Sequence, residues 1–241
     1  MSHQQLPGPI ALERELIHAS GARRAWPYTP IKRLLDIVAS ALLLIALSPV
    51  FLLTALAVAV CDGFPIFFRQ VRVGKNGVPF NMWKFRSMRP RPVQLAAEAE
   101  TVRQSAAALE DPYAGWSDGV PDDFVFKAGF HPDVTRLGRF LRSSSLDELP
   151  QLFNVLMGHM SLIGPRPEVP AIAKYYNETQ RRRLLVRPGI TGHAQVNGRS
   201  LIPHGEKIAN DLQYVRDCSL RMDVRILWKT LLLVLGKKGA Y

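Results

Sequence analysis

A run of 24 residues without a charge, from Ile37 to Val60, constrains this 241-residue chain more than any other feature. At about 1.5 Å per helical residue, such a run can cross a hydrocarbon core of about 30 Å. The run is longer than a buried helix of a soluble protein needs to be. No small-x-small cleavage site precedes Cys61, which argues against a cleavable signal peptide. The sequence therefore predicts a helix within a membrane.

A helix breaker stands in the middle of this run. Pro49 has no N–H for the Ile45 carbonyl and its ring crowds that oxygen, so we expect a kink, and Ser48 can help to satisfy the freed group. Both flanks of the run are basic: Arg23, Arg24, Lys32 and Arg33 precede it, and Arg69, Arg72, Lys75, Lys84, Arg86 and Arg89 follow it. Because Lys and Arg stay on the cytoplasmic side of a membrane, we expect a re-entrant helix with both ends in the cytoplasm. A kinked helix that spans the membrane is the alternative.

The charge balance indicates an anionic partner. Lys and Arg outnumber Asp and Glu by 31 to 20, for a net charge of +11. Nucleic acid, anionic lipid headgroups and phosphorylated small molecules would all satisfy it. The two cysteines, Cys61 and Cys218, form no C-x-x-C pair, and the six histidines include no zinc-protease spacing. A disulfide framework and a structural zinc site are therefore excluded as organising features.

The rest of the chain predicts a mostly α-helical fold with a small β-hairpin. Residues 67–73 alternate as a strand does, residues 74–77 form a turn, and residues 80–85 return. Apolar positions recur at helical spacing in three further segments, residues 149–160, 169–185 and 208–218. Residues 223–235 predict an amphipathic helix, which suits either the membrane interface or the core of the catalytic domain.

Three regions follow from this pattern. They are an irregular N-terminal arm (1–30) with a short helix at 12–18, the re-entrant membrane helix (31–62), and a cytoplasmic catalytic domain with interfacial helices (63–241). Within the last region, residues 93–110 predict a surface helix, and a loop rich in turn formers follows it.

An acidic pair, Asp147 and Glu148, offers the clearest chemistry. Pro150 is tolerated in the first turn of a helix, so the pair falls at or just before a helix N-terminus, where unpaired N–H groups favour an ionised Asp147 and a bound phosphate. The alternative is a capping box between Ser145 and Glu148, but Pro150 would then press on Leu146. Four arginines surround the pair in sequence, as at a site that handles phosphate: Arg136, Arg139, Arg142 and Arg166.

Several ordered motifs resemble one family. They are Lys32–Asp36, Ser48–Pro49, Phe68–Gln70, Lys84–Met88, Thr135–Arg142, Leu146–Asn154, Ser161–Glu168 and Val186–Gly192. Together they resemble the bacterial sugar transferases, that is, the monotopic polyprenyl-phosphate phosphoglycosyl transferases, in their small single-domain form. The resemblance covers residues 31–241.

The resemblance implies an enzyme that moves a sugar 1-phosphate from a UDP-sugar to polyprenyl (undecaprenyl) phosphate and releases UMP, an early step of glycan assembly at the bacterial inner membrane. It implies a helix broken at Ser48–Pro49 and a catalytic domain on the cytoplasmic face among phospholipids. Asp147 and Glu148 would be the catalytic pair and the Mg²⁺ ligands, with Asp147 forming a covalent phospho-sugar and with a general base as the alternative role for Glu148. The implied substrate-binding residues are Lys84, Arg86, Arg142 and Arg166.

Two positions depart from the family pattern. Gly158-His159-Met160-Ser161 and Gly192-His193-Ala194-Gln195 each carry a histidine where the family commonly has Asp and Trp, respectively. The sugar, the glycan pathway and a possible homodimer remain open.

Two other classes of function compete with this interpretation. A basic membrane-tethered nucleic-acid-binding protein would need aromatics among the basic residues or a recognition helix, and neither pattern is evident, so we expect no nucleic-acid partner. A scaffold without chemistry would not need the Asp147–Glu148 pair.

Overall fold

The computed structural model describes residues 28–89, 111, 113–125, 133–198 and 202–236; the helices expected at 12–18 and 93–110 lie outside them. The helices are α2 (Tyr28–Ala46), α3 (Ser48–Cys61), α5 (Arg136–Ser143), α6 (Gln151–Met157), α7 (Pro170–Ala173), α8 (Glu178–Arg181), α9 (His193–Asn197), α10 (His204–Asp217) and α11 (Leu220–Leu235). Three single turns of 3-10 helix are η1 (Lys75–Gly77), η2 (Leu146–Glu148) and η3 (Arg182–Leu185). The strands are β1 (Phe67–Val73), β2 (Pro79–Phe85), β3 (Ser161–Ile163) and β4 (Gly189–Thr191). The described fold is mostly helical with two small sheets, which confirms the expected secondary-structure class.

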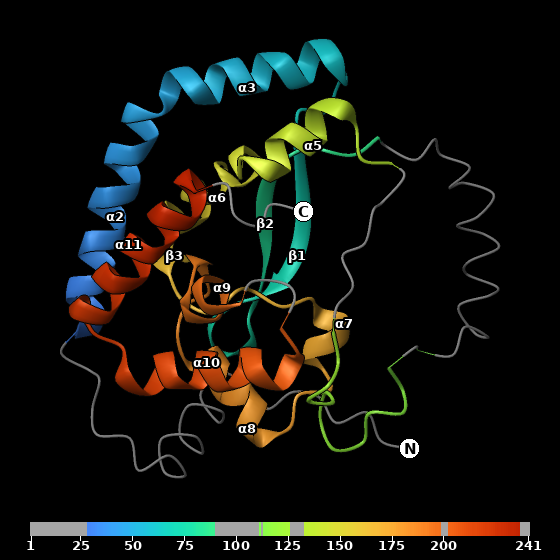
Figure 1. Cartoon of the computed structure of the whole chain (residues 1–241), viewed down its shortest axis with the longest axis vertical. Coiled ribbons are helices and arrows are strands. Elements are labelled where there is room, and N and C mark those ends of the chain that lie inside the picture. Colours follow the sequence, from blue (N-terminus) through green and yellow to red (C-terminus); the bar gives the residue numbers. More distant parts are fainter. Residues whose placement is uncertain (1–27, 90–110, 112, 126–132, 199–201, 237–241) are drawn as a thin grey trace.

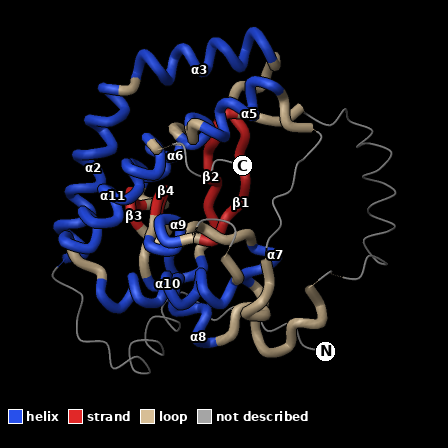
Figure 2. Tube along the Cα trace, in the orientation of Figure 1, coloured by secondary structure: helices blue, strands red, loops and turns tan. Residues whose placement is uncertain are grey.

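The predicted hairpin is present. Strands β1 and β2 pair antiparallel, from Phe67 opposite Phe85 to Val73 opposite Pro79. The turn between them needs two positive φ angles, which Asn76 (57°) and Gly77 (78°) supply. The hairpin stands in the middle of the molecule, with helices around it (Figure 2).

The apolar run forms two helices with a sharp bend between them. No one helix in the described chain is both long and apolar enough to cross a bilayer, but Pro30–Ala46 and Ser48–Cys61 meet that requirement together, bent by 64°. Pro49 lies in the first turn of α3, and Ser48 Oγ donates to the Ile45 carbonyl over 2.8 Å. The kink and its compensating hydroxyl are therefore as predicted. Helices α2 and α3 form an arch beside and above the rest of the protein (Figure 1).

The foot of this arch is tied to the body of the protein. Arg33 donates to the carbonyls of Val155 and Leu156 at 2.6 and 2.8 Å, next to the end of α6. The buried Asp36 carboxylate accepts from Ser161 Oγ and the Leu162 N–H, both at 3.1 Å.

Helix α11 lies beside α2 (Figure 1), and Lys32 Nζ donates to Asp223 Oδ2 over 2.6 Å. Helix α11 buries Ile226 and exposes Trp228 on another face, so the two interpretations of the tail helix are compatible.

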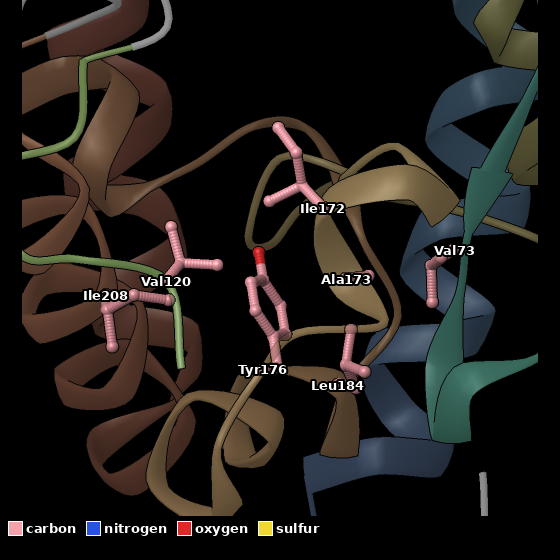
Figure 3. Close-up of a cluster of buried hydrophobic side chains, with 7 residues drawn as sticks. All are labelled: Val73, Val120, Ile172, Ala173, Tyr176, Leu184 and Ile208. Carbon is pink, nitrogen blue, oxygen red and sulfur yellow. The ribbon is translucent and has the colours of Figure 1, made fainter. Parts of the chain in front are cut away.

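The prediction of a single helix over residues 169–185 is wrong. The segment is broken into α7, α8 and η3, because Asn177 starts a new helix with a capping box to Gln180. The breaks let Ile172, Tyr176 and Leu184 reach one core. They meet Val73, Val120 and Ile208 there (Figure 3).

The described residues 113–125 pack against this core. The Gln180 side chain accepts from the Val120 N–H at 3.0 Å and donates to the Val120 carbonyl at 2.7 Å. Trp116 stacks its edge against Phe124 and Tyr175. This part of the predicted loop is therefore fastened to the core.

The second sheet was not predicted. Strands β3 and β4 pair in parallel, with Ser161 opposite Gly189. A Cβ atom on Gly189 would lie 2.1 Å from the Gly164 nitrogen, so this close approach requires glycine. The sheet therefore fixes the position of the C-terminal end of β3, and the loop that carries Arg166 begins there.

Candidate active site

The acidic pair lies on η2, a single turn that leads straight into α6. Asp147 and Glu148 are its last two residues, and the Leu152 N–H bonds the Leu149 carbonyl across the junction. Ser145 precedes the turn with a φ of 57° and its side chain caps nothing. The capping-box alternative is therefore wrong, because a left-handed Ser145 does not direct its hydroxyl at the following N–H groups.

Glu148 is held by two cations on one oxygen. Lys84 Nζ, from β2, lies 2.9 Å from Glu148 Oε1, and Arg166 Nη2 lies 2.8 Å from the same atom. Burial alone would raise the pKa of Glu148, but the charges and hydrogen bonds of Arg166 and Lys84 hold it below its usual range. Glu148 is therefore a fixed anion at neutral pH.

Asp147 has a different environment. It is 6% exposed, and the nearest cation, Lys84 Nζ, is 3.9 Å from Asp147 Oδ2. Burial raises the pKa of Asp147 to about 6, the Lys84 charge opposes this, and the Glu148 charge adds to it. The expectation that a helix N-terminus governs Asp147 is corrected here: η2 is one turn long, and burial is the largest influence on the pKa of Asp147. Asp147 is still mostly ionised at neutral pH.

The other predicted site residues separate into two groups. Lys84 and Arg166 meet the dyad directly, and the positive charge of Arg142 also acts on Asp147. Arg142 is oriented by its Nε donating to Ser87 Oγ at 3.0 Å. The buried Arg86 instead donates to the carbonyls of Asp62 and Gly63 at the end of α3. Its substrate role stays a prediction; the contacts shown are with the residues that follow α3.

The loop that carries Arg166 is held from several sides. The Arg166 carbonyl accepts from Arg183 Nη2 at 2.9 Å. The next carbonyl, of Pro167, accepts from Arg72 Nη1 at 3.2 Å. Arg183 is buried and paired with the buried Asp211, with Nη2 2.6 Å from Oδ2. Sequence reasoning missed Arg183, Asp211 and Arg72, because their partners are distant in the chain. The only signal was a charged residue inside an apolar helical pattern.

The carboxylate oxygens of Asp147 and Glu148 are ligands of the kind that Mg²⁺ binds. Within the described ranges, no cluster of three or more His, Cys, Asp or Glu side chains comes together. Two adjacent carboxylates suffice where substrate phosphates and water supply the remaining ligands, as is usual for Mg²⁺. The residues present therefore fit a metal that binds together with a phosphorylated substrate.

Comparison with known proteins places the chain in a family. The family model for the bacterial sugar transferases matches residues 27–237. The chain is 40% identical over 211 residues to a protein of Haemophilus influenzae described as an uncharacterized sugar transferase, covering 88% of this chain and 42% of that one. It is 39% identical over 219 residues to the UDP-glucose:undecaprenyl-phosphate glucose-1-phosphate transferase of Klebsiella pneumoniae, covering 87% of this chain and 41% of that one.

A shorter relative is matched over most of its length. The uncharacterized sugar transferase EpsL of Bacillus subtilis is 39% identical over 209 residues, covering 87% of this chain and 89% of that one. The chain thus spans about two-fifths of the first two relatives and about nine-tenths of the third. With a family match over nearly all of its described residues, the chain belongs to the bacterial sugar transferase family.

Proposed function

We propose that this protein transfers a sugar 1-phosphate from a UDP-sugar to polyprenyl phosphate, releases UMP, and does so through a covalent phospho-sugar on Asp147. The observation that carries the proposal is the unequal treatment of the two neighbouring carboxylates. Glu148 is engaged by Lys84 and Arg166, whereas Asp147 is buried with its pKa raised to about 6. Two titratable groups pushed apart by their surroundings mark different roles.

Asp147 suits the role of nucleophile. A carboxylate with a raised pKa is more basic than an ordinary one and still mostly ionised at neutral pH, so it combines availability with reactivity. Glu148, tied at one oxygen to two cations, is the less reactive of the pair. Its fixed negative charge instead keeps Lys84 and Arg166 beside Asp147.

In the first step, an Asp147 oxygen attacks the sugar-bearing phosphorus of the UDP-sugar. A P–O bond forms to Asp147, and the P–O bond that joins this phosphorus to the bridging oxygen breaks. UMP leaves with that oxygen and its electron pair. Phosphoryl transfer depends mainly on positioning and charge neutralisation, and Lys84, Arg142 and Arg166 supply positive charge at the dyad.

In the second step, a phosphate oxygen of polyprenyl phosphate attacks the same phosphorus. A new P–O–P linkage forms and the bond from Asp147 to phosphorus breaks, which returns the carboxylate. The product is a polyprenyl diphosphate sugar. Both steps use one nucleophilic oxygen and one leaving oxygen, so no oxidant or further co-reactant is needed.

Mg²⁺ is the cofactor we propose, held by Asp147 and Glu148 together with the phosphates of the bound substrate. When bound, it would neutralise negative charge on those phosphates. Lys84 and Arg166, which both contact Glu148, supply further positive charge for those phosphates. Both cations would help to hold the donor phosphates beside the dyad.

The bent helix pair supports a re-entrant membrane segment. Both helices expose large apolar side chains, among them Leu42 and Ile45 on α2 and Leu52, Leu53 and Leu56 on α3, each at least 60% exposed. So much exposed apolar surface is stable in lipid and costly in water. We propose that the arch enters the inner membrane from the cytoplasmic face and returns, with phospholipid around it.

UMP release tests the proposal. The purified protein, in detergent with Mg²⁺, is mixed with undecaprenyl phosphate and, in turn, with UDP-glucose, UDP-galactose and UDP-N-acetylated sugars. We expect UMP with at least one donor, and a loss of at least about a thousandfold in Asp147→Asn, because an amide cannot attack phosphorus. A radiolabelled sugar phosphate should remain on the wild-type protein when undecaprenyl phosphate is omitted. UMP release by Asp147→Asn at the wild-type rate would overturn the assignment of the nucleophile.

A further inference from the structure

Asn154 on α6 is completely buried. It joins α6, the helix that follows the dyad turn, to β2, the strand that carries Lys84. Its side chain lies between α6 and β2 and is 0% exposed. Asn154 Oδ1 accepts from the Trp83 N–H at 2.9 Å, and Asn154 Nδ2 donates to the Asn81 carbonyl at 2.7 Å. The two groups belong to alternate residues on one edge of β2, so the amide occupies the place of a neighbouring strand.

This edge of β2 has no strand beside it among the described residues. The sheet contains β1 and β2 alone, and β1 takes the other edge. A side-chain amide presents N–H donors and a carbonyl acceptor side by side, so it can pair with the N–H and C=O groups of a strand edge. Because both partners are backbone groups, the contact fixes the position of β2, along the strand direction, relative to α6.

Each element positions one half of the site. Lys84 follows Trp83 directly on β2, and its Nζ lies 2.9 Å from Glu148 Oε1. Glu148 stands six residues before Asn154, on the turn that runs into α6. Asn154 therefore contacts β2, which carries Lys84, and Lys84 contacts Glu148. From Glu148, the last residue of η2, the chain continues into α6, which carries Asn154.

We propose that Asn154 is a positioning residue that sets the distance between Lys84 and the Asp147–Glu148 pair. The inference rests on the proposed function, in which Lys84 neutralises phosphate charge beside Asp147. Packing alone brings β2 near α6, through Met82 and Val155, but apolar contacts tolerate sliding. Two directional hydrogen bonds do not, because a shift along the strand would break both at once.

Gln180 is a matched control. It is also a buried amide, 5% exposed, and it also bonds one N–H and one carbonyl of a distant residue, Val120, in addition to the Asn177 N–H in the capping box of α8. Its bonds fasten residues 113–125 instead of β2. Asn154→Ala and Gln180→Ala therefore remove similar buried hydrogen bonds at different places, and thermal unfolding of both variants shows whether the structural loss is comparable.

The first measurement is a double-mutant cycle on UMP release. We expect Asn154→Ala to lower kcat by about tenfold or more, because misplacing a catalytic group by about 1 Å costs that much. On a Lys84→Gln background the same substitution should lower the remaining rate by less than about twofold, since the group it positions is gone. Gln180→Ala should leave kcat of the folded protein within about twofold. Equal losses with and without Lys84 would overturn the proposal.

The second measurement does not depend on turnover. Hydrogen exchange in wild type should show slow exchange at residues 81–84 and 146–149, and Asn154→Ala should speed exchange in both segments together, with Gln180→Ala leaving both slow. If Asn154→Ala does not fold, Asn154→Ser takes its place, because a hydroxyl can keep one of the two bonds. Unchanged exchange at 146–149 would sink the positioning role. An inactive wild type would instead defeat the proposed function, with the exchange result still deciding on Asn154.

Discussion

Arg166 Nη2 donates to Glu148 Oε1 across 2.8 Å, although the two residues stand 18 positions apart on different elements. The contact joins the loop after β3 to the dyad turn. Lys84 reaches the same oxygen from β2, so one carboxylate gathers cations from two directions. Glu148 therefore serves as the electrostatic centre of the site as well as a candidate metal ligand.

Replacing Glu148 with glutamine should cripple the enzyme without unfolding it. The amide keeps the shape but loses the charge, so Lys84 and Arg166 repel each other with no anion between them. We expect kcat for UMP release to fall by about 10²-fold or more. Glu178→Gln is the matched control, because Glu178 pairs with Arg182 at an exposed position, 3.5 Å away. A near-normal rate with unchanged Mg²⁺ dependence in Glu148→Gln would contradict this role.

The rate should fall on the acidic side of pH 6. Burial raises the pKa of Asp147 to about 6, and protonation removes the nucleophile, so below that pH the rate should drop about tenfold per unit. Because the Lys84 charge lowers the pKa of Asp147, Lys84→Gln should move this acidic limb to higher pH. Initial rates of wild type and of Lys84→Gln, measured across pH 5–8 at fixed, saturating Mg²⁺ and donor, give the acidic limb of each protein. A limb that stays in place in Lys84→Gln would show that another group titrates.

Local patterns in the sequence predicted the parts of the fold that depend on neighbours in the chain. Alternation and a glycine-bounded turn gave the hairpin, and Pro49 gave the bend with Ser48 beside it. The resemblance brought Lys84, Arg166 and the acidic pair into one site, and the geometry agrees.

The remainder depended on contacts between distant residues. The helix expected over 169–185 is broken because three of its apolar side chains must reach one core, and periodicity alone cannot show this. Asn154 is an ordinary polar residue in the sequence, and its importance comes from two backbone partners over 70 residues away. The raised pKa of Asp147 likewise follows from burial that no local pattern reveals.

Removing the Asp211 carboxylate should destabilise the protein strongly. Asp211→Asn removes the closest anion of the buried Arg183 and leaves Glu168, 3.6 Å away, as its remaining ionic partner; breaking a buried pair costs up to about 3–5 kcal/mol. The midpoint of denaturant unfolding, followed in detergent, measures this. Asp217→Asn is the control, because its pair with Arg216 is exposed and should leave the midpoint unchanged. Equal midpoints for the two variants would rule out an important buried pair.

Substituting Pro49 should disturb the topology. Pro49→Ala restores an N–H for Ile45 and removes the ring clash, so the arch can straighten towards a full span. The basic N-terminal flank resists crossing, so we expect a mixed population with lower UMP release. Ala25→Cys, with Cys61 and Cys218 changed to serine, is labelled from the periplasmic side with and without Pro49→Ala. Labelling should appear only with Pro49→Ala. Equal labelling and equal turnover would mean that Pro49 does not set the topology.

The ties at the foot of α2 bear on how this enzyme can be handled. Arg33 supplies the hydrogen-bond donors for the Val155 and Leu156 carbonyls, and Asp36 supplies an acceptor at the start of β3. A fragment that began at residue 63 would lose all of these contacts; the Val155 carbonyl would keep its bond from the Gly158 N–H, but the Leu162 N–H would lose its Asp36 acceptor. Helix α2 is thus a structural part of the folded unit that carries the dyad. Trimming it to obtain a soluble enzyme would remove part of the scaffold that holds Asp147 in place.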